Sequence, residues 1–406
     1  MSQPYFELPF FTNLLILLVT ARILGEIFER FRQPAMIGEI IAGMILGPSL
    51  LNLIHRTEEI KVISELGIFL LVILAGLEIN IDDIIRSLRG KKIFISLLAF
   101  FLPISSGFAV GYFFGKNIMT SLFIGLCVAI TALPVSIRIL MDLKKINTPF
   151  GQNVISVAIF DDVFALTILA VLLNIKDSDK SLTAVMKAGT VSLLKLILFL
   201  TLLSLAYLLI RRLLSRGNYI QESLDKLVGF LKGKEPLFAL FFAFVLLFST
   251  VTENLGLHFI VGTFFAAMLI SDALIGKENL KAIETTTSNI AMGFLAPIFF
   301  AGIGLEFNVS SIDNLALLAG VILVSYLSKI AGGFLGGILA GLGSRFSLVL
   351  GMGLNARGIM ELVIANIAYR NGLIDNEVFS ILVIMGVLTT LTTPLILKRA
   401  FIAFRI

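Results

Sequence analysis

Cysteine and histidine are almost absent from this 406-residue chain. The single cysteine, Cys127, excludes an intrachain disulfide. The two histidines, His55 and His258, are far apart and near the ends of apolar stretches, so no Cys/His cluster points to a structural metal. No nucleophile–base constellation and no phosphate-cradling loop is present, so we expect that the chain is not an enzyme.

Charged residues are also few, at 15% against about 25% in soluble domains. Apolar residues make up 58% of the chain, and the mean hydropathy is +1.01. A soluble globular fold of this size could not bury this much apolar surface. The composition therefore predicts an all-α polytopic membrane protein. The N-terminus lacks a basic region and a small-residue cleavage site, so we expect its first apolar segment to be a membrane span rather than a removable signal.

The hydropathy pattern predicts thirteen transmembrane helices. Their approximate cores are Pro9–Phe28, Met36–Ile54, Val62–Ile79, Ile93–Phe114, Ile118–Met141, Phe150–Leu173, Val191–Ile210, Pro236–Val251, Leu257–Ile270, Ile290–Phe307, Leu315–Leu342, Phe346–Tyr369 and Val378–Leu397. An odd number of spans places the two termini on opposite sides of the membrane.

Basic residues orient these spans. With the N-terminus outside, 21 Lys and Arg residues fall in inner loops and seven in outer loops. The positive-inside rule therefore predicts an outer N-terminus and a cytoplasmic C-terminus. The net charge of +5 follows from this topology and gives no reason to expect a nucleic-acid partner.

Two adjacent carboxylates, Asp161 and Asp162, lie in the middle of the sixth apolar stretch. One charge at that depth costs about 2.5 to 3.5 kcal/mol on insertion scales. Two neighbouring charges also repel each other, so packing alone does not account for the pair. The pattern indicates a cation or proton site inside a transport protein.

A weak internal repeat divides the chain. The pentapeptide Gly76–Asn80 (GLEIN) recurs as Gly304–Asn308 (GLEFN), and Gly38–Met44 aligns loosely with Gly262–Met268 at nearly the same offset. We therefore predict three regions: spans one to six in residues 1–175, a connecting span and loop in 176–233, and spans eight to thirteen in 234–406. Seven intervening crossings would invert the second copy, and inverted repeats are the usual frame of secondary transporters.

Helix-breaking residues fall at corresponding places in the two copies. Pro134 interrupts the fifth span, and Thr131 adds a hydroxyl beside it. The twelfth span contains Asn355 and Gly358 among further glycines. We expect two broken helices that cross near the acidic pair and supply freed carbonyls and half-helix dipoles. The alternative at Pro134 is a simple kink.

Two basic residues also lie deep in predicted spans. Lys329 is too far from either span end to reach the membrane surface, and the acidic pair offers a partner at similar depth. Arg357 also needs a counter-charge, for which Glu78 and Glu361 are the candidates. A purely architectural pairing is the alternative for Arg357.

Four motifs together resemble one transporter family. They are Gln33–Ser49 (QPAMIGEIIAGMILGPS), Leu66–Leu71 with Gly76–Glu78, Gly353–Gly358 (GLNARG) and Leu388–Leu395 (LTTLTTPL). The set, which spans essentially the whole chain, is similar to the Kef-type, NapA-like monovalent cation:proton antiporters. The resemblance implies the NhaA/NapA fold, with two inverted six-helix repeats and crossed broken helices. It also implies a six-helix core bundle, a separate dimerisation bundle, a homodimer, elevator-like movement and a bacterial or archaeal inner membrane.

The Asp-Asp pair resembles that of the electrogenic sodium/proton exchangers. Carried over, Asp162 binds sodium or a proton, with Thr131 as a further oxygen ligand, and Asp161 pairs with Lys329. Kef potassium-efflux proteins usually differ at the first position of the pair and carry a cytosolic nucleotide-binding regulatory domain. This sequence ends at Ile406, so we expect no such domain here.

The predicted function is therefore an electrogenic antiport of a monovalent cation and protons. Burial disfavours a charged carboxylate, so cation and protons can compete for Asp161 and Asp162. No cofactor is expected beyond the transported ions, which are Na⁺, K⁺ or Li⁺, and H⁺. Four alternatives remain open: an electroneutral potassium/proton exchanger of Kef type, a sodium-coupled organic-anion symporter, a channel, and a membrane sensor or scaffold.

Overall fold

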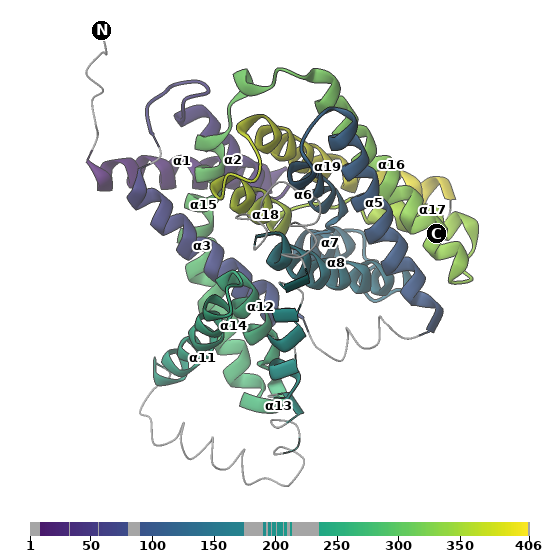
Figure 1. Cartoon of the computed structure of the whole chain (residues 1–406), viewed down its shortest axis with the longest axis horizontal. Coiled ribbons are helices and arrows are strands. Elements are labelled where there is room, and N and C mark those ends of the chain that lie inside the picture. Colours follow the sequence, from purple (N-terminus) through teal and green to yellow (C-terminus); the bar gives the residue numbers. More distant parts are fainter. Residues whose placement is uncertain are drawn as a thin grey trace.

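A computed structural model describes residues 9–404, apart from 32, 56, 80–89, 174–189 and most of 192–234. Every regular element in these residues is a helix (Figure 1). The first half contains α1 Phe10–Arg30, α2 Ala35–Leu46, α3 Glu58–Leu77, α5 Ile93–Phe113, α6 Ile118–Ala129, α7 Leu133–Asp142 and α8 Pro149–Leu173. The second half contains α11 Glu235–Asn254, α12 Phe259–Leu269, α13 Asp272–Ile275, α14 Lys277–Ile290, the π-helix η2 Ala291–Leu295, α15 Ala296–Glu306, α16 Leu315–Leu339, α17 Ser344–Gly353, α18 Ile359–Arg370 and α19 Asn376–Phe404.

Within the described ranges, nine helical segments are long and apolar enough to cross a bilayer. The interrupted pair α6–α7 and the continuous run α14–η2–α15 each count as one segment. The prediction of an all-helical, polytopic membrane protein is therefore confirmed, while the total of thirteen spans stays a prediction. The seventh predicted span and the connecting region 176–233 lie largely outside the described residues.

Two helix boundaries differ clearly from the hydropathy prediction. The second span was expected to reach Ile54, but α2 ends at Leu46 because Gly47 and Pro48 cannot continue it well. The tenth was expected to begin near Ile290, but a continuous helix starts at Lys277. The additional segment Lys277–Ile290 is polar, so a hydropathy scale cannot detect it.

The helices pack as two groups. In the first, α1, α2, α3, α11, α12, α14 and α15 pack mainly on one another; in the second, α5 to α8 and α16 to α19 do so. Figure 1 shows α11, α12 and α14 with α3 at the lower left, and α5, α16, α17 and α19 at the upper right. Only a few contacts, such as those of α12 with α8 and of α18 with α3, connect the two groups.

Glycines allow close packing within the first group. A Cβ atom at Gly43 on α2 would lie 1.9 Å from the carbonyl oxygen of Ala301 on α15. A Cβ atom at Gly76 on α3 would lie 2.5 Å from the carbonyl oxygen of Phe264 on α12. Small residues of this kind let helix backbones approach where lipid supplies no hydrophobic driving force.

Candidate functional site: a buried acidic pair at two interrupted helices

The predicted break at Pro134 is a full interruption. α6 ends at Ala129 and α7 begins at Leu133. The three residues between them are not helical, and Ile130 and Ala132 have extended backbone. Pro134 sits in the first turn of α7, where its missing N–H breaks no helical hydrogen bond. The structure therefore has a helix interruption at this place rather than a simple kink.

The second predicted break lies between α17 and α18. α17 ends at Gly353 and α18 begins at Ile359, so Asn355 and Gly358 fall in the link. Gly358 precedes α18 in extended backbone, and a Cβ atom there would lie 2.8 Å from a methyl carbon of Val135 on α7. Glycine therefore permits the two half-helices to meet at this point.

The two links are hydrogen-bonded to each other. The Ala132 N–H donates to the Ala356 carbonyl at 2.8 Å, and the Thr131 hydroxyl donates to the Leu354 carbonyl at 2.9 Å. The carbonyls of Leu354 and Ala356 thus each accept one hydrogen bond from the other link and keep a second lone pair. The Thr131 oxygen keeps lone pairs that can still coordinate a cation.

The acidic pair lies on α8 and is buried, with Asp161 0% and Asp162 1% exposed. Lys329, on α16 and also 0% exposed, donates to Asp161 Oδ2 at 2.7 Å. Lys329 Nζ also donates to the Ala99 carbonyl at 3.0 Å and to the Ala129 carbonyl. The structure thus brings Asp161 and Lys329 together.

Asp162 is in a different situation from its neighbour. Among the residues described, no ion pair to its carboxylate is found, whereas Asp161 is paired with Lys329. Within the same residues the Oδ1 atom of Asp162 has no hydrogen-bond partner, which is also true of Asp161 Oδ1. Asp161 is adjacent, and Glu78 and Lys329 are near enough to act on Asp162 electrostatically. An acceptor oxygen that is buried and unpaired in this way is suited to bind a proton or a small cation.

Arg357 lies in the link between α17 and α18 and hydrogen-bonds to the end of α6, next to the other link. Its Nη2 donates to the carbonyls of Val128 and, at 3.4 Å, Ser325. Its carboxylate partner is Glu361, one turn along α18, with 3.8 Å between Nε and Oε2. Of the two candidates, Glu361 is therefore the one in contact, whereas Glu78 lies exposed at the end of α3.

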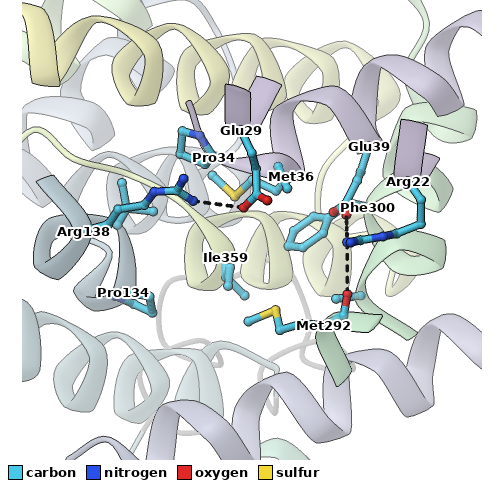
Figure 2. A pocket seen from close by; sticks show the side chains of 13 residues that line it. Arg22, Glu29, Pro34, Met36, Glu39, Pro134, Arg138, Met292, Phe300 and Ile359 are labelled. Carbon is cyan, nitrogen blue, oxygen red and sulfur yellow. Dashed lines mark hydrogen bonds and ion pairs between the residues drawn. The ribbon is translucent and has the colours of Figure 1, made fainter. Parts of the chain in front are cut away.

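One buried carboxylate went unassigned in the sequence. Glu39 on α2 is 3% exposed and faces Arg22 of α1 in a cavity between the helix groups (Figure 2). The sequence signal was present, because Glu39 is the only acidic residue of an otherwise apolar predicted span. Glu39 also belongs to the motif Gln33–Ser49, which was interpreted only as a family resemblance.

A family model described as "Sodium/hydrogen exchanger, transmembrane" matches residues 14–403. The chain belongs to the sodium/hydrogen exchanger family. The predicted class, a secondary cation/proton antiporter, is thereby confirmed at the level of the family, while the narrower Kef-type assignment stays a prediction.

Alignments with named relatives cover nearly the whole length of this exchanger. The Na⁺/H⁺-K⁺ antiporter GerN of Bacillus cereus is 26% identical, and the alignment covers 97% of each chain. The Na⁺/H⁺ antiporter of Enterococcus hirae is 29% identical over 96% of this chain and 97% of the relative. NhaS4 of Synechocystis, also named a Na⁺/H⁺ antiporter, is 30% identical over 95% and 96%.

A solved structure shares the fold. The sodium proton antiporter MjNhaP1 from Methanocaldococcus jannaschii, solved at pH 8, superposes with a TM-score of 0.68 over 96% of both chains. Only 16% of the residues are identical, so this likeness concerns the fold alone.

Proposed function

We propose that this exchanger moves Na⁺, or another monovalent cation, against protons by competition at Asp161 and Asp162. The observation that carries the proposal is the buried acidic pair itself: one carboxylate holds Lys329, and the other has an unpaired oxygen beside two interrupted helices. Such intramembrane ionisable groups mark ion pathways and proton relays.

Each residue takes a distinct role. Asp162 binds the cation or a proton, and the Thr131 oxygen is a further ligand. Asp161 holds Lys329 between cycles. An ionised and empty carboxylate is costly to move within the bilayer, so the site crosses only when it is loaded with a cation or neutralised by a proton.

The inverted repeat gains support from the packing of the first helix group. In the proposed repeat, α2 corresponds to α12 and α3 to α15. The close contact of α2 with α15 then has its counterpart in the close contact of α12 with α3. The sparse contacts between the two helix groups fit an elevator movement of the second group, α5 to α8 and α16 to α19, against a dimerising first group.

We further propose that the exchange is electrogenic. If the cation separates Lys329 from Asp161, Lys329 can release a proton, so two protons can be exchanged for one cation. A membrane potential must then alter the transport rate. The Bacillus cereus relative carries K⁺ in its name, so electroneutral potassium/proton exchange is the competing possibility.

Purified protein in proteoliposomes tests the proposal. Proton flux is followed while Na⁺, Li⁺ and K⁺ are supplied in turn, with and without an imposed potential. Asp162→Asn should abolish the exchange. The matched control is Glu58→Gln, because the Glu58 side chain is 83% exposed, and it should keep full activity. Exchange that persists in Asp162→Asn would refute the site, and a wild-type rate unaffected by voltage would refute electrogenicity.

A further inference from the structure

A cavity of about 270 Å³ lies between the two helix groups (Figure 2). α1 and α2 of the first group line one side, and α7 and α18 of the second group line the other. Its apolar walls include Met36, Phe300 and Ile359. The cavity reaches Pro134, three residues beyond Thr131, so it approaches the helix breaks from the side of the membrane at which α1 ends.

Two acidic side chains of this cavity differ in how they are paired. Glu29 accepts a hydrogen bond from Arg138 at 3.1 Å, and both side chains are about two-fifths exposed. Glu39 has a buried side chain, only 4% exposed, yet its Oε1 lies 3.7 Å from Arg22 Nη1, beyond hydrogen-bonding distance. Arg22 is itself 44% exposed and donates instead to the Met292 carbonyl at 3.5 Å.

The loose pairing of Glu39 has an energetic consequence. A buried carboxylate recovers its desolvation cost only through close, hydrogen-bonded partners. An arginine at 3.7 Å provides Coulomb attraction but no hydrogen bond. The carboxylate therefore gains if a small cation approaches it more closely than Arg22 does. Arg22 lines the same cavity and its side chain is 44% exposed, so this long side chain can move away from Glu39 as the ion arrives.

We propose that Glu39 receives the transported cation in this cavity, exchanging Arg22 for the ion before the ion passes to Asp162. The inference rests on the proposed function and names a residue that controls cation access from one side of the membrane. Glu39 belongs to the first helix group, whereas Asp162 belongs to the second. In the proposed elevator movement, Glu39 therefore stays in place while Asp162 moves with the second group. Arg22 competes with the cation for the Glu39 carboxylate.

Substitutions of Glu39 and of Arg22 must then change the apparent KM for the cation in opposite directions. Glu39→Gln removes the acceptor, so the apparent KM for the cation on that face should rise on the order of tenfold. Arg22→Gln removes the competitor, so the KM on the same face should fall. In both variants Vmax should change by no more than about twofold, because the residues bind the ion only during access. The KM on the opposite face should not change.

Everted and right-side-out membrane vesicles from an antiporter-deficient bacterial host expose the two faces separately. The initial rate of cation-induced proton movement is measured against Na⁺ concentration in each. Glu26→Gln is the matched control on α1, because the Glu26 side chain is 51% exposed, and it should leave both KM values unchanged.

Two results would overturn the proposal. One is an equal loss of Vmax in Glu39→Gln and Arg22→Gln at unchanged KM, as expected of a pair that only joins α1 to α2. The other is an unchanged KM in Arg22→Gln, which remains measurable even if Glu39→Gln fails to fold. A wild-type protein without exchange would instead refute the proposed function, so the two failures can be told apart.

Discussion

Replacing Lys329 by alanine should destabilise the protein in a pH-dependent way. The substitution removes the 2.7 Å ion pair and leaves the Asp161 carboxylate buried at 0% exposure. Breaking a buried pair by removing one partner costs about 3 to 5 kcal/mol. Protonation of Asp161 offers an escape, because a neutral carboxyl group needs no counter-charge.

The expected size of the effect follows from proton linkage. In the variant, folded Asp161 retains a proton that the unfolded chain releases, so stability falls as the pH rises. One proton gives a slope of about 1.4 kcal/mol per pH unit, so the loss builds up over about two to four units before it levels off. Asp161→Asn should cost less, because Lys329 keeps the carbonyls of Ala99 and Ala129 as acceptors.

The chain offers a convenient probe of unfolding. Cys127 is its only thiol and is fully buried, so a dye that fluoresces on reaction with thiols reports its exposure during heating. Each variant is compared with the parent protein at the same pH, because thiol reactivity itself rises with pH. The double variant Asp161→Asn, Lys329→Gln should recover much of the lost stability. A loss in Lys329→Ala that is no larger at pH 9 than at pH 5 would refute the reasoning.

Two further predictions concern packing and the loops. Gly43→Ala should sharply reduce the yield of monodisperse protein in size-exclusion chromatography, because its Cβ would meet the Ala301 carbonyl; Gly293→Ala is the control, since nothing lies within 4 Å of its Cβ. Burial alone would lower the pKa of Lys116, but its hydrogen bonds to Glu377 and Asp375 raise that pKa above the ordinary value. Lys116→Met should therefore cost about 1 to 2 kcal/mol near neutral pH in the thiol assay. This difference should vanish as the pH rises through the raised pKa, and a loss that persists there would contradict the assignment.

The sequence predicted those parts of the site that depend on strong local chemistry. A proline cannot continue a helix, so the break at Pro134 could be located to within a few residues. A lysine at mid-span needs a carboxylate, and only one acidic pair lay at a similar depth, so a contact of Lys329 with this pair could be predicted. The choice of Asp161 over Asp162 followed from the family resemblance alone.

Other features depend on three-dimensional contacts or on polar helices. That Thr131 donates to the Leu354 carbonyl is set by how the two links meet, which no local pattern encodes. The start of α14 at Lys277 was missed because hydropathy detects only the apolar part of a helix. Glu39 stands out in the sequence as the only carboxylate of its predicted span, but its loose pairing with Arg22 is a distance that residue types do not give.

Two buried cations meet the same helix end, which gives both of them acceptors other than the acidic pair. Lys329 donates to the Ala129 carbonyl and Arg357 to the Val128 carbonyl, which are among the last carbonyls of α6. The end of an interrupted helix carries partial negative charge, so it stabilises both cations independently of the carboxylates. If a proton or Na⁺ neutralises Asp161, Lys329 therefore still has acceptors, whether it keeps its proton or releases it. The interruption of α6 thus leaves the buried Lys329 with a backbone acceptor that does not depend on the charge of α8.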